Sequence, residues 1–396
     1  MAEPLKNVYN LKFLQQLGAK IQRVYGAFDV PGFIKGVLGR EWKTLALKER
    51  MRKISETLGA YLPPSYEDAL GMLLLIAEDC TGFPYLIFPD FVALHGLDKQ
   101  YRKLSLKALE LFTQQSSAEF AIRPFIKQDP EGVMKQMSAW ARHKNEHVRR
   151  LSSEGCRPRL PWGESLPVFK KDPAPVLAVL EQLKADPSLY VRKSVANNLN
   201  DISKDHPGLV LETAKRWKGQ NPDTDWIIRR GCRGLIRQGD AQAYALFDYD
   251  PLGAENPGDQ SSLISAVDFS LMPGQLRIGD RGELCYAFTV REGDPVRLRV
   301  EYGVDFVRAG GRDGKEKQPG QEKDRRTLAL PRVSRKLFVL LDKTVEGGVR
   351  VTGKRVHKWA DLNTRRHYPG DHGITLLVNG REIARGTLKL LPGEKS

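Results

Sequence analysis

The N-terminal part of the chain repeats apolar side chains at intervals of three and four, the spacing of an amphipathic helix. Between residues 5 and 28 this spacing is almost unbroken, which predicts one long helix that ends at the Val-Pro-Gly that follows. Residues 42–59 fit the same pattern, and residues 66–80 are apolar on nearly all sides, which predicts a buried helix. The proline-broken segment 81–89 is expected to be a connector packed on the core.

Helices that begin with basic residues recur along the chain. They start at Tyr101 (YRKLSLKAL), Val148 (VRRLSSEG), Val191 (VRKSVANNL) and Ile228 (IRRGCRGL), so the starts are 47, 43 and 37 positions apart. HEAT and armadillo repeats have periods of roughly 40–47 residues. Partner helices fit between the starts, at residues 131–143, 175–184 and 208–218. We therefore predict a mainly α protein built as a HEAT-like α-solenoid.

The central helix of this series, within residues 190–207, has one apolar and one polar face. The apolar face consists of Val191, Val195, Leu199 and Ile202. The polar face carries Asn197, Asn198 and Asp201, and the first turn carries Arg192 and Lys193. One helix of each solenoid pair lines the concave surface, and the helix with the repeated basic residues is expected to do so here.

The net charge of the chain indicates the kind of partner that this surface binds. The net charge is +15 and the pI is near 9.6, which favours a nucleic-acid partner over a merely soluble basic surface. The expected cationic lining is Arg102, Lys103, Arg149, Arg150, Arg192, Lys193, Arg229 and Arg230. In the alternative interpretation one arginine of each pair bonds the next repeat, and a smaller cationic groove remains.

The period of the apolar pattern changes to two in the C-terminal part. Alternation at residues 284–290, 296–300, 337–341 and 374–378 predicts strands, and Asn379-Gly380 predicts a tight hairpin. This pattern is typical of a small antiparallel β-sandwich of immunoglobulin-like size. The composition of residues 248–262 is that of a linker. We predict a helical domain at residues 1–254, a linker at 255–268 and the sandwich at 269–396. Within it, the polar segment 310–326 is expected to be a mobile loop.

A second basic segment, residues 353–372, mixes cations with aromatic residues. Its candidate DNA contacts are Lys358, Trp359, Arg365, Arg366, His367 and Tyr368. Cations suit phosphates and aromatic rings suit sugars or bases, so we expect a DNA-contacting loop. The alternative is a solvated basic loop with Trp359 packed into the sandwich.

Several classes of site are excluded by missing motifs. The sequence contains no GxxxxGK[ST], GxGxxG, HExxH or GxSxG motif, and its four cysteines form no CxxC pair. His143 and His147 are four residues apart without a third ligand nearby, so they suit a solvated helix end better than a metal. We expect no metal and no cofactor. No apolar run is long enough to span a bilayer and no secretory signal is evident, so we expect a cytoplasmic protein.

Catalysis would then depend on carboxylates. Glu119, in QQSSAEFAIRPFI, either caps a helix or lies at the rim of the groove. Asp201 shares a helical face with Asn197, four residues earlier. In a groove lined with arginine both acids would stay ionised, and each would need a positive partner to avoid repelling a polyanion.

The segment RPRLPWG, residues 157–163, lies between two repeats and is stiffened by two prolines. It would present Trp162 on a rigid loop. The side chain is either a buried gap-filler or a contact to a base or a deoxyribose.

Several long strings resemble one known family. LPPSYEDAL from Leu62, EFAIRPF from Glu119, HVRRLSSEGCRPRLPWG from His147, VRKSVANNLNDISKDHP from Val191 and RRHYPGDHGITLLVNG from Arg365 are similar to the AlkC and AlkD alkylpurine DNA glycosylases. The resemblance covers the whole chain. AlkD-like proteins usually have a tryptophan at the position of Asn197 and lack the β domain, so the AlkC branch fits better.

This resemblance implies a monofunctional glycosylase that removes cationic alkylated bases, such as 3-methyladenine and 3-methylcytosine, from duplex DNA without base flipping. By similarity, Glu119, Trp162 and Asp201 match the active-site positions of the family. Because the alkylated base leaves as a neutral molecule, the enzyme needs carboxylates mainly to stabilise an oxocarbenium-like sugar and to position water. The β domain would help to encircle the duplex.

The expected partner is double-stranded DNA carrying alkylated bases, bound by a monomer associated with the nucleoid. The DNA contacts expected on the solenoid are Arg149, Arg150, Arg157, Arg159, Arg192, Lys193, Asn197, Asn198, Arg229 and Arg230. A non-catalytic HEAT-repeat DNA-binding or scaffold protein is the main alternative, and a protein-binding solenoid is the third. Neither explains two acids on a cationic lining.

Overall fold

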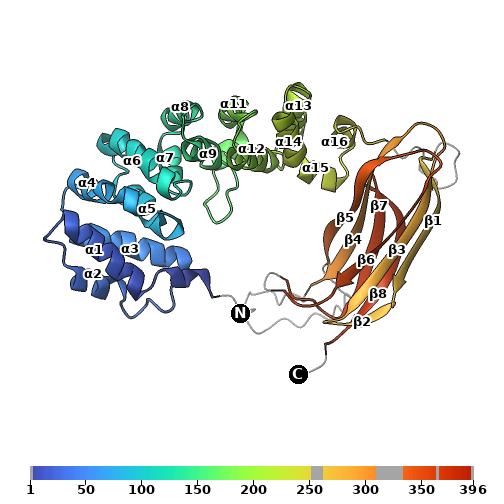
Figure 1. Cartoon of the computed structure of the whole chain (residues 1–396), viewed down its shortest axis with the longest axis horizontal. Helices are drawn as coiled ribbons and strands as arrows, with labels where there is room; N and C mark the ends of the chain where they lie inside the picture. Colours follow the sequence, from blue (N-terminus) through green and yellow to red (C-terminus); the bar gives the residue numbers. More distant parts are fainter. Residues whose placement is uncertain (1–2, 251–261, 309–332, 363–364, 394–396) are drawn as a thin grey trace, which may run out of the picture. The chain divides into compact units, whose positions relative to one another are not determined.

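The computed structural model describes residues 3–250, 262–308, 333–362 and 365–393 (Figure 1). The chain divides into two compact units, Met1–Cys232 and Arg233–Ser396. The first is built from helices and the second contains all the described strands. The predicted fold class, a helical repeat followed by an immunoglobulin-like sandwich, is confirmed. None of the helices in the described part of the chain is both long and apolar enough to cross a membrane.

The first helices differ from the prediction. They are η1 (Leu5–Val8), α1 (Leu11–Val24), α2 (Val30–Val37), α3 (Leu47–Tyr61), α4 (Tyr66–Leu75), η2 (Ala77–Asp79), η3 (Phe83–Leu86), α5 (Ile87–His95) and η4 (Lys99–Tyr101). The single helix predicted over residues 5–28 is wrong, because Asn10 is extended and its side chain accepts from the Phe13 N–H to start α1. The connector predicted over 81–89 is also wrong. Pro89 lies in the first turn of α5, where a proline is tolerated.

The repeats follow the predicted pattern of paired helices. They comprise α6 (Arg102–Gln115), α7 (Ile122–Gln128), α8 (Pro130–Trp140), α9 (Glu146–Glu154), α10 (Pro167–Lys171), α11 (Ala174–Leu183), α12 (Leu189–Ile202), α13 (Pro207–Trp217) and α14 (Pro222–Gly231). Figure 1 shows α8, α11 and α13 in one row and α9, α12 and α14 in a second row. The second row carries the predicted basic segments. They lie near the starts of α9 and α12, but Arg229 and Arg230 lie in the last turn of α14, so the helix start predicted at Ile228 is wrong.

The apolar face of α12 holds this layer together. Val191, Val195, Leu199 and Ile202 are all buried, as the spacing predicted. The helix packs between α9 and α14. At the α14 contact a Cβ on Gly231 would lie 3.0 Å from Cβ of Leu199, closer than most such contacts, so glycine favours the close approach of the two helices. This packing fixes where α12 presents its polar residues.

The second unit begins with two short helices and continues as two sheets. Its elements are α15 (Arg233–Gln238), α16 (Ala241–Leu246), β1 (Ile264–Met272), β2 (Gln275–Arg277), β3 (Arg281–Val290), β4 (Val296–Val307), β5 (Val333–Val345), β6 (Arg350–Lys358), β7 (Gly370–Val378) and β8 (Arg381–Leu391). The strand orders are β1-β3-β6 and β2-β8-β7-β4-β5. Phe288, Leu298 and Leu376 are among the fully buried residues between the sheets.

The predicted domain limits differ from this division. The first compact unit ends at Cys232 instead of residue 254, and β1 starts at Ile264, inside the linker predicted over 255–268. Residues 255–261 of that linker and the predicted loop 310–326 lie outside the described residues. The helices α15 and α16 therefore belong with the sandwich.

The predicted hairpin joins β7 to β8. Asn379 and Gly380 both have positive φ angles, 44° and 80°, which a tight turn of this kind needs. The Asn379 side chain also donates to the carbonyl of Asp250 at 2.8 Å and accepts from the N–H of Arg299 at 2.7 Å. The turn thus anchors the segment that follows α16 to the sheet.

Candidate active site

A continuous row of alternating charges joins the two predicted acids. We call it the charge row, and its members in order are Glu119, Arg150, Glu154, Arg157, Asp201 and Lys204. At its first end Nη1 of Arg150 lies 3.1 Å from Oε2 of Glu119. Nη2 of the same arginine lies 3.5 Å from Oε1 of Glu154.

The second half of the row reaches α12. Nη1 of Arg157 lies 2.7 Å from Oε1 of Glu154, and Nε of Arg157 donates to Oδ2 of Asp201 at 2.8 Å. The other oxygen of Asp201, Oδ1, accepts from Nζ of Lys204 at 3.2 Å. The structure therefore brings Glu119 and Asp201 into one site, although 82 positions separate them in the sequence.

Helix α9 is the element that links the two acids. It carries Arg150 and Glu154 one turn apart, while Glu119 lies in the turn before α7 and Asp201 in the last turn of α12. Oε2 of Glu154 accepts from the hydroxyl of Ser194 on α12 at 2.7 Å. Glu154 was not predicted as a site residue. The position of an acid along a helix does not indicate that two arginines will enclose it in the folded chain.

Burial gives these ion pairs their strength. Glu154 and Arg157 are each 6% exposed and Asp201 is 2% exposed. Burial by itself lowers the pKa of Arg157, but the carboxylates of Glu154 and Asp201 outweigh it and raise that pKa. The pKa of Arg150 is likewise raised by Glu119 and Glu154 against the effect of burial. Both guanidinium groups stay charged, so the expected positive partner of each acid is present.

The two acids differ in which oxygens are occupied. Among the described residues, the donors to Glu119 are Ser117 and Arg150, and both meet Oε2. Asp201 has a donor on each oxygen. Of these donors Arg157 has a side chain that is 8% exposed, whereas the side chain of Lys204 is 49% exposed and has room to move.

Trp162 lies on the loop between α9 and α10 and points outward. Its side chain is 66% exposed, and its φ of 62° places the backbone in the left-handed region that non-glycine residues rarely adopt. The interpretation of Trp162 as a buried gap-filler is therefore wrong. A strained, exposed aromatic residue is typical of a functional contact.

Arg123 clamps this loop from inside. It is 2% exposed, and it donates to the carbonyls of Gly155 and Arg157 at 2.9 Å and to that of Glu164 at 2.7 Å. Burial lowers its pKa to about 10. The sequence singled out the string EFAIRPF without indicating this role.

Ion pairs and a lysine hold the loop from outside. Arg159 pairs with Asp205 at 2.6 Å, one helical turn beyond Asp201. Lys48 on α3 donates to the carbonyl of Trp162 at 2.8 Å. Beside these contacts lies a cavity of about 130 Å³, bordered by Phe120 and Gly163, the residues that follow Glu119 and Trp162 in sequence. The loop that carries Trp162 is thus held both by buried contacts and by contacts at the surface.

The first arginine of three of the repeated basic pairs bonds the next repeat. Arg149 pairs at 2.7 Å with Asp186, between α11 and α12, and Arg192 pairs at 3.0 Å with Asp223 on α14. Arg102 pairs in the same way with Asp129, the N-cap of α8. For these three pairs the alternative, in which one arginine holds the repeats together, is correct. These side chains stabilise the solenoid.

The remaining predicted DNA contacts on the solenoid divide by exposure. Lys193 and Arg230 are exposed, and Asn197 and Arg229 are half-buried. Asn198 is fully buried, and its side-chain amide donates to the carbonyl of Ser153 at 2.7 Å. A DNA contact by Asn198 is therefore wrong, because α9 covers the face of α12 on which it lies.

Known proteins match this chain over both units. A family model described as DNA alkylation repair enzyme matches residues 97–233, which include the whole charge row and Trp162. A second model, the C-terminal Ig-like domain of the uncharacterised protein YhaZ, matches residues 329–392. The protein YhaZ of Bacillus subtilis (strain 168) is 40% identical over 376 residues, 95% of this chain and 96% of that protein.

This chain belongs to the DNA alkylation repair enzyme family. Among solved structures it is similar to the alkylpurine DNA glycosylase AlkC of Pseudomonas fluorescens, bound to DNA containing an abasic site analogue. The TM-score is 0.86 and the identity 35%, over 98% of this chain and 100% of that one. The resemblance stated from the sequence is confirmed.

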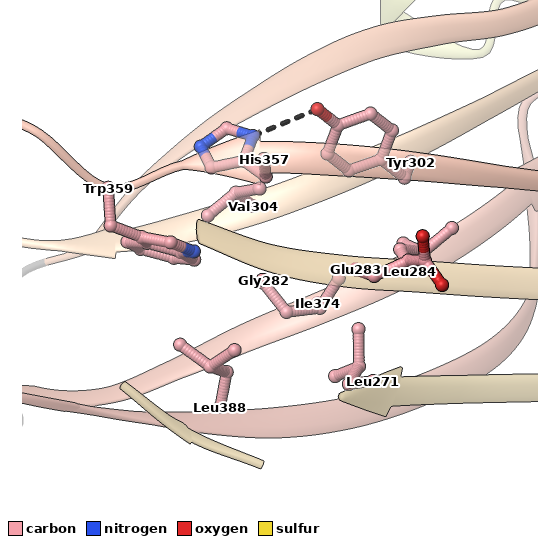
Figure 2. A pocket seen from close by; sticks show the side chains of 10 residues that line it. All are labelled: Leu271, Gly282, Glu283, Leu284, Tyr302, Val304, His357, Trp359, Ile374 and Leu388. Carbon is pink, nitrogen blue, oxygen red and sulfur yellow. Dashed lines mark hydrogen bonds between the residues drawn. The ribbon is translucent and has the colours of Figure 1, made fainter. Parts of the chain in front are cut away.

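In the β unit, the structure of residues 353–372 differs from the predicted loop. Strand β6 extends to Lys358 and β7 begins at Gly370, so much of that segment is sheet. Trp359 is 1% exposed, and Figure 2 shows its ring beside a small interior cavity of about 20 Å³. The alternative, with Trp359 packed into the sandwich, is correct. A DNA contact by Trp359 is wrong.

Histidines surround Trp359 in this core. The rings of His357, His367 and His372 lie 5.0, 5.7 and 4.9 Å from it, and Nδ1 of His357 is 2.9 Å from the hydroxyl of Tyr302 (Figure 2). His367 is 6% exposed, so the expected DNA contact by this residue is wrong as well.

Four predicted DNA contacts of the β unit remain at least partly accessible. Lys358 and Arg366 are exposed, and Arg365 and Tyr368 are half-buried. The guanidinium of Arg365 lies over the ring of Phe306, 4.4 Å from its centre. Across the described residues no three His, Cys, Asp or Glu side chains are grouped as metal ligands would be.

Proposed function

We propose that this protein is a monofunctional DNA glycosylase that hydrolyses the glycosidic bond of cationic alkylated bases, such as 3-methyladenine and 3-methylcytosine, in duplex DNA without base flipping. The observation that carries the proposal is the charge row, which pairs Glu119 and Asp201 with buried guanidinium groups, together with the exposed Trp162 on the loop that follows α9. The DNA partner is supported by AlkC, whose structure contains DNA with an abasic site analogue.

The charge row suits a reaction in which the base needs no acid. An alkylated base is already positive and leaves as a neutral molecule, so positive charge develops on the sugar. A fixed carboxylate stabilises that charge and accepts a proton from the attacking water. The guanidinium groups of Arg150 and Arg157 contact these carboxylates directly.

Glu119 is the acid that we assign to the sugar and the water. Its Oε2 is held by Ser117 and Arg150, which leaves Oε1 to act on a substrate. Asp201 reaches a substrate through Oδ1 only when the half-exposed Lys204 moves away. Until then Asp201 acts by fixing Arg157 and by its negative charge.

The row also explains how acids coexist with a DNA backbone. It contains three carboxylates and three basic groups, so it carries no net charge toward phosphates. Lys193 and Arg230 on the helical unit and Lys358 and Arg366 on the β unit are exposed cations that suit phosphate contacts. Trp162 would stack on the cationic base, a contribution of roughly 1–2 kcal/mol.

The test measures release of free base from duplex DNA treated with a methylating agent. The native protein is expected to release 3-methyladenine, and Glu119→Gln is expected to slow release about 100-fold, since the charge is lost and the shape kept. Asp201→Asn is expected to be slow too, and its melting temperature is checked because Arg157 loses one of its two ion pairs. Duplex binding should persist in both variants.

Glu131→Gln is the matched control, because this acid lies on α8 with a side chain that is 82% exposed and pairs with Lys135. Its rate should equal that of the native protein. Binding of the methylated duplex without any release of base would favour the non-catalytic DNA-binding alternative. Full activity of both Glu119→Gln and Asp201→Asn would remove the proposed mechanism.

A further inference from the structure

Tyr190 is an aromatic residue on the second position of α12 whose side chain is 40% exposed. Its ring lies under the guanidinium of Arg150, whose Cζ is 4.9 Å from the ring centre. The ring of His147, at the start of α9, meets it edge-on at 5.5 Å. An exposed tyrosine thus contacts an arginine of the charge row directly.

This contact completes the surroundings of Arg150. Two carboxylates and a hydroxyl occupy the edge of the guanidinium: Glu119 at 3.1 Å, Glu154 at 3.5 Å and Ser117 at 2.8 Å. Tyr190 covers its flat face, and the arginine side chain is left 14% exposed. Acceptors at the edge and a ring on the face fix both the position and the tilt of the group.

An arginine next to bound DNA has a competing acceptor, since guanidinium and phosphate form strong bidentate pairs. If Arg150 turned toward a phosphate, Glu119 would lose the donor on Oε2. If it instead turned to meet both oxygens of Glu119, Oε1 would no longer be open to substrate. Because the guanidinium lies over the ring of Tyr190 at 4.9 Å, displacing it in either direction gives up part of that contact, so Tyr190 favours the observed position.

We propose that Tyr190 is a positioning residue of the glycosylase site, which holds Arg150 on Oε2 of Glu119 and keeps Oε1 open. The inference rests on the proposed function, because it assigns Glu119 to the sugar. The proposed role requires the aromatic ring of Tyr190 and does not require its hydroxyl.

The experiment compares Tyr190→Leu with Tyr190→Phe in the full chain, on a methylated duplex under single-turnover conditions. Loss of a cation–π contact should slow base release about 5- to 30-fold in Tyr190→Leu. The dissociation constant for the duplex should stay within about threefold or become smaller, since a freed arginine binds phosphate. Tyr190→Phe keeps the ring and should release base within about twofold of the native rate.

Leu189→Ala is the matched control, because Leu189 is the preceding residue on α12 and is 45% exposed. Its rate and its binding should match those of the native protein. If the melting temperature of Tyr190→Leu is unchanged, slower base release reflects a misplaced Arg150 and not a less stable fold.

Three outcomes would overturn the inference while the proposed function stands: a native rate in Tyr190→Leu, equal slowing in Tyr190→Phe, or weaker duplex binding at an unchanged rate, which makes Tyr190 a DNA contact only. Failure of the proposed function looks different, because then the native protein itself releases no base.

Discussion

Arg157 donates its Nε hydrogen to Asp201 at 2.8 Å, and both side chains are almost fully buried. Arg159, two residues on, pairs with Asp205 in the turn that follows α12, and there the side chains are 35% and 24% exposed. The same loop is thus tied to the end of α12 by a buried arginine–aspartate pair and to the turn after it by a more exposed one.

The two pairs should differ sharply in their effect on stability. Arg157→Met removes the cation that lies between two buried acids and leaves Asp201 paired with Lys204 alone and Glu154 paired with Arg150 alone. We expect a loss of about 3–5 kcal/mol in the free energy of unfolding. Arg159→Met removes a partly exposed pair and should cost about 1 kcal/mol or less. Urea denaturation of both variants measures the difference. Equal losses would show that burial does not set the strength of these pairs.

Trp162 should affect activity without affecting stability. Its side chain is 66% exposed, so Trp162→Ala removes little buried surface and should leave the melting temperature nearly unchanged. If it stacks on the cationic base, the rate of base release should fall about tenfold, while Trp162→Phe should retain most of it. Single-turnover release and a thermal melt are measured on the same samples. A large fall in melting temperature would mean that the ring supports the fold.

Stability of the β unit should depend on pH through the histidines around Trp359. Burial lowers the pKa of His357 to about 4 and lowers those of His367 and His372. An unfolded histidine titrates near 6.5, so below that pH the unfolded state takes up protons that the folded state does not. The stabilisation is therefore complete above about pH 6.5 and is lost as the pH falls toward the folded pKa values.

Calorimetric melts between pH 7.5 and 5 provide the measurement for this prediction. The β unit should melt at lower temperature as the pH decreases, and His357→Phe should flatten that dependence because it removes one titrating group. The pH range is well above the carboxylate pKa values of roughly 4, so acids contribute little. A slope identical in the variant would mean that His357 is not involved.

The segment 233–250 should stabilise the sandwich although the sequence assigns it to the solenoid. The hydroxyl of Tyr249 lies 3.1 Å from each carboxylate oxygen of Asp342 on β5, and Oδ2 of Asp250 accepts from the N–H of Arg297 at 2.8 Å. A fragment of residues 233–396 should therefore be more stable than one of residues 262–396, by about 2–4 kcal/mol for these hydrogen bonds. Equal urea midpoints would place the segment outside the cooperative unit.

Much of the architecture follows from local pattern. The apolar spacing and the recurring basic segments located α9, α12 and the partner helices α8, α11 and α13 within a few residues, because an amphipathic helix needs only its own apolar face to be recognised. They missed the start of α14, which begins at Pro222 and not at Ile228. Asn379-Gly380 located the β7–β8 turn, because positive φ at two successive residues restricts which side chains fit. The break at Asn10 was missed, since a cap inside an unbroken apolar pattern is a one-residue signal.

The sequence by itself determined that a basic helical repeat precedes a β-sandwich, and that Glu119, Asp201 and Trp162 are the residues to examine. Only the tertiary structure decided how similar residues differ. Trp162 is exposed whereas Trp359 is buried in the core, and Arg149 pairs with Asp186 of the next repeat whereas Arg150 pairs with Glu119. The reason is physical. Composition and spacing act within one segment, whereas exposure and ion pairing depend on segments about 40 residues apart that only folding brings together.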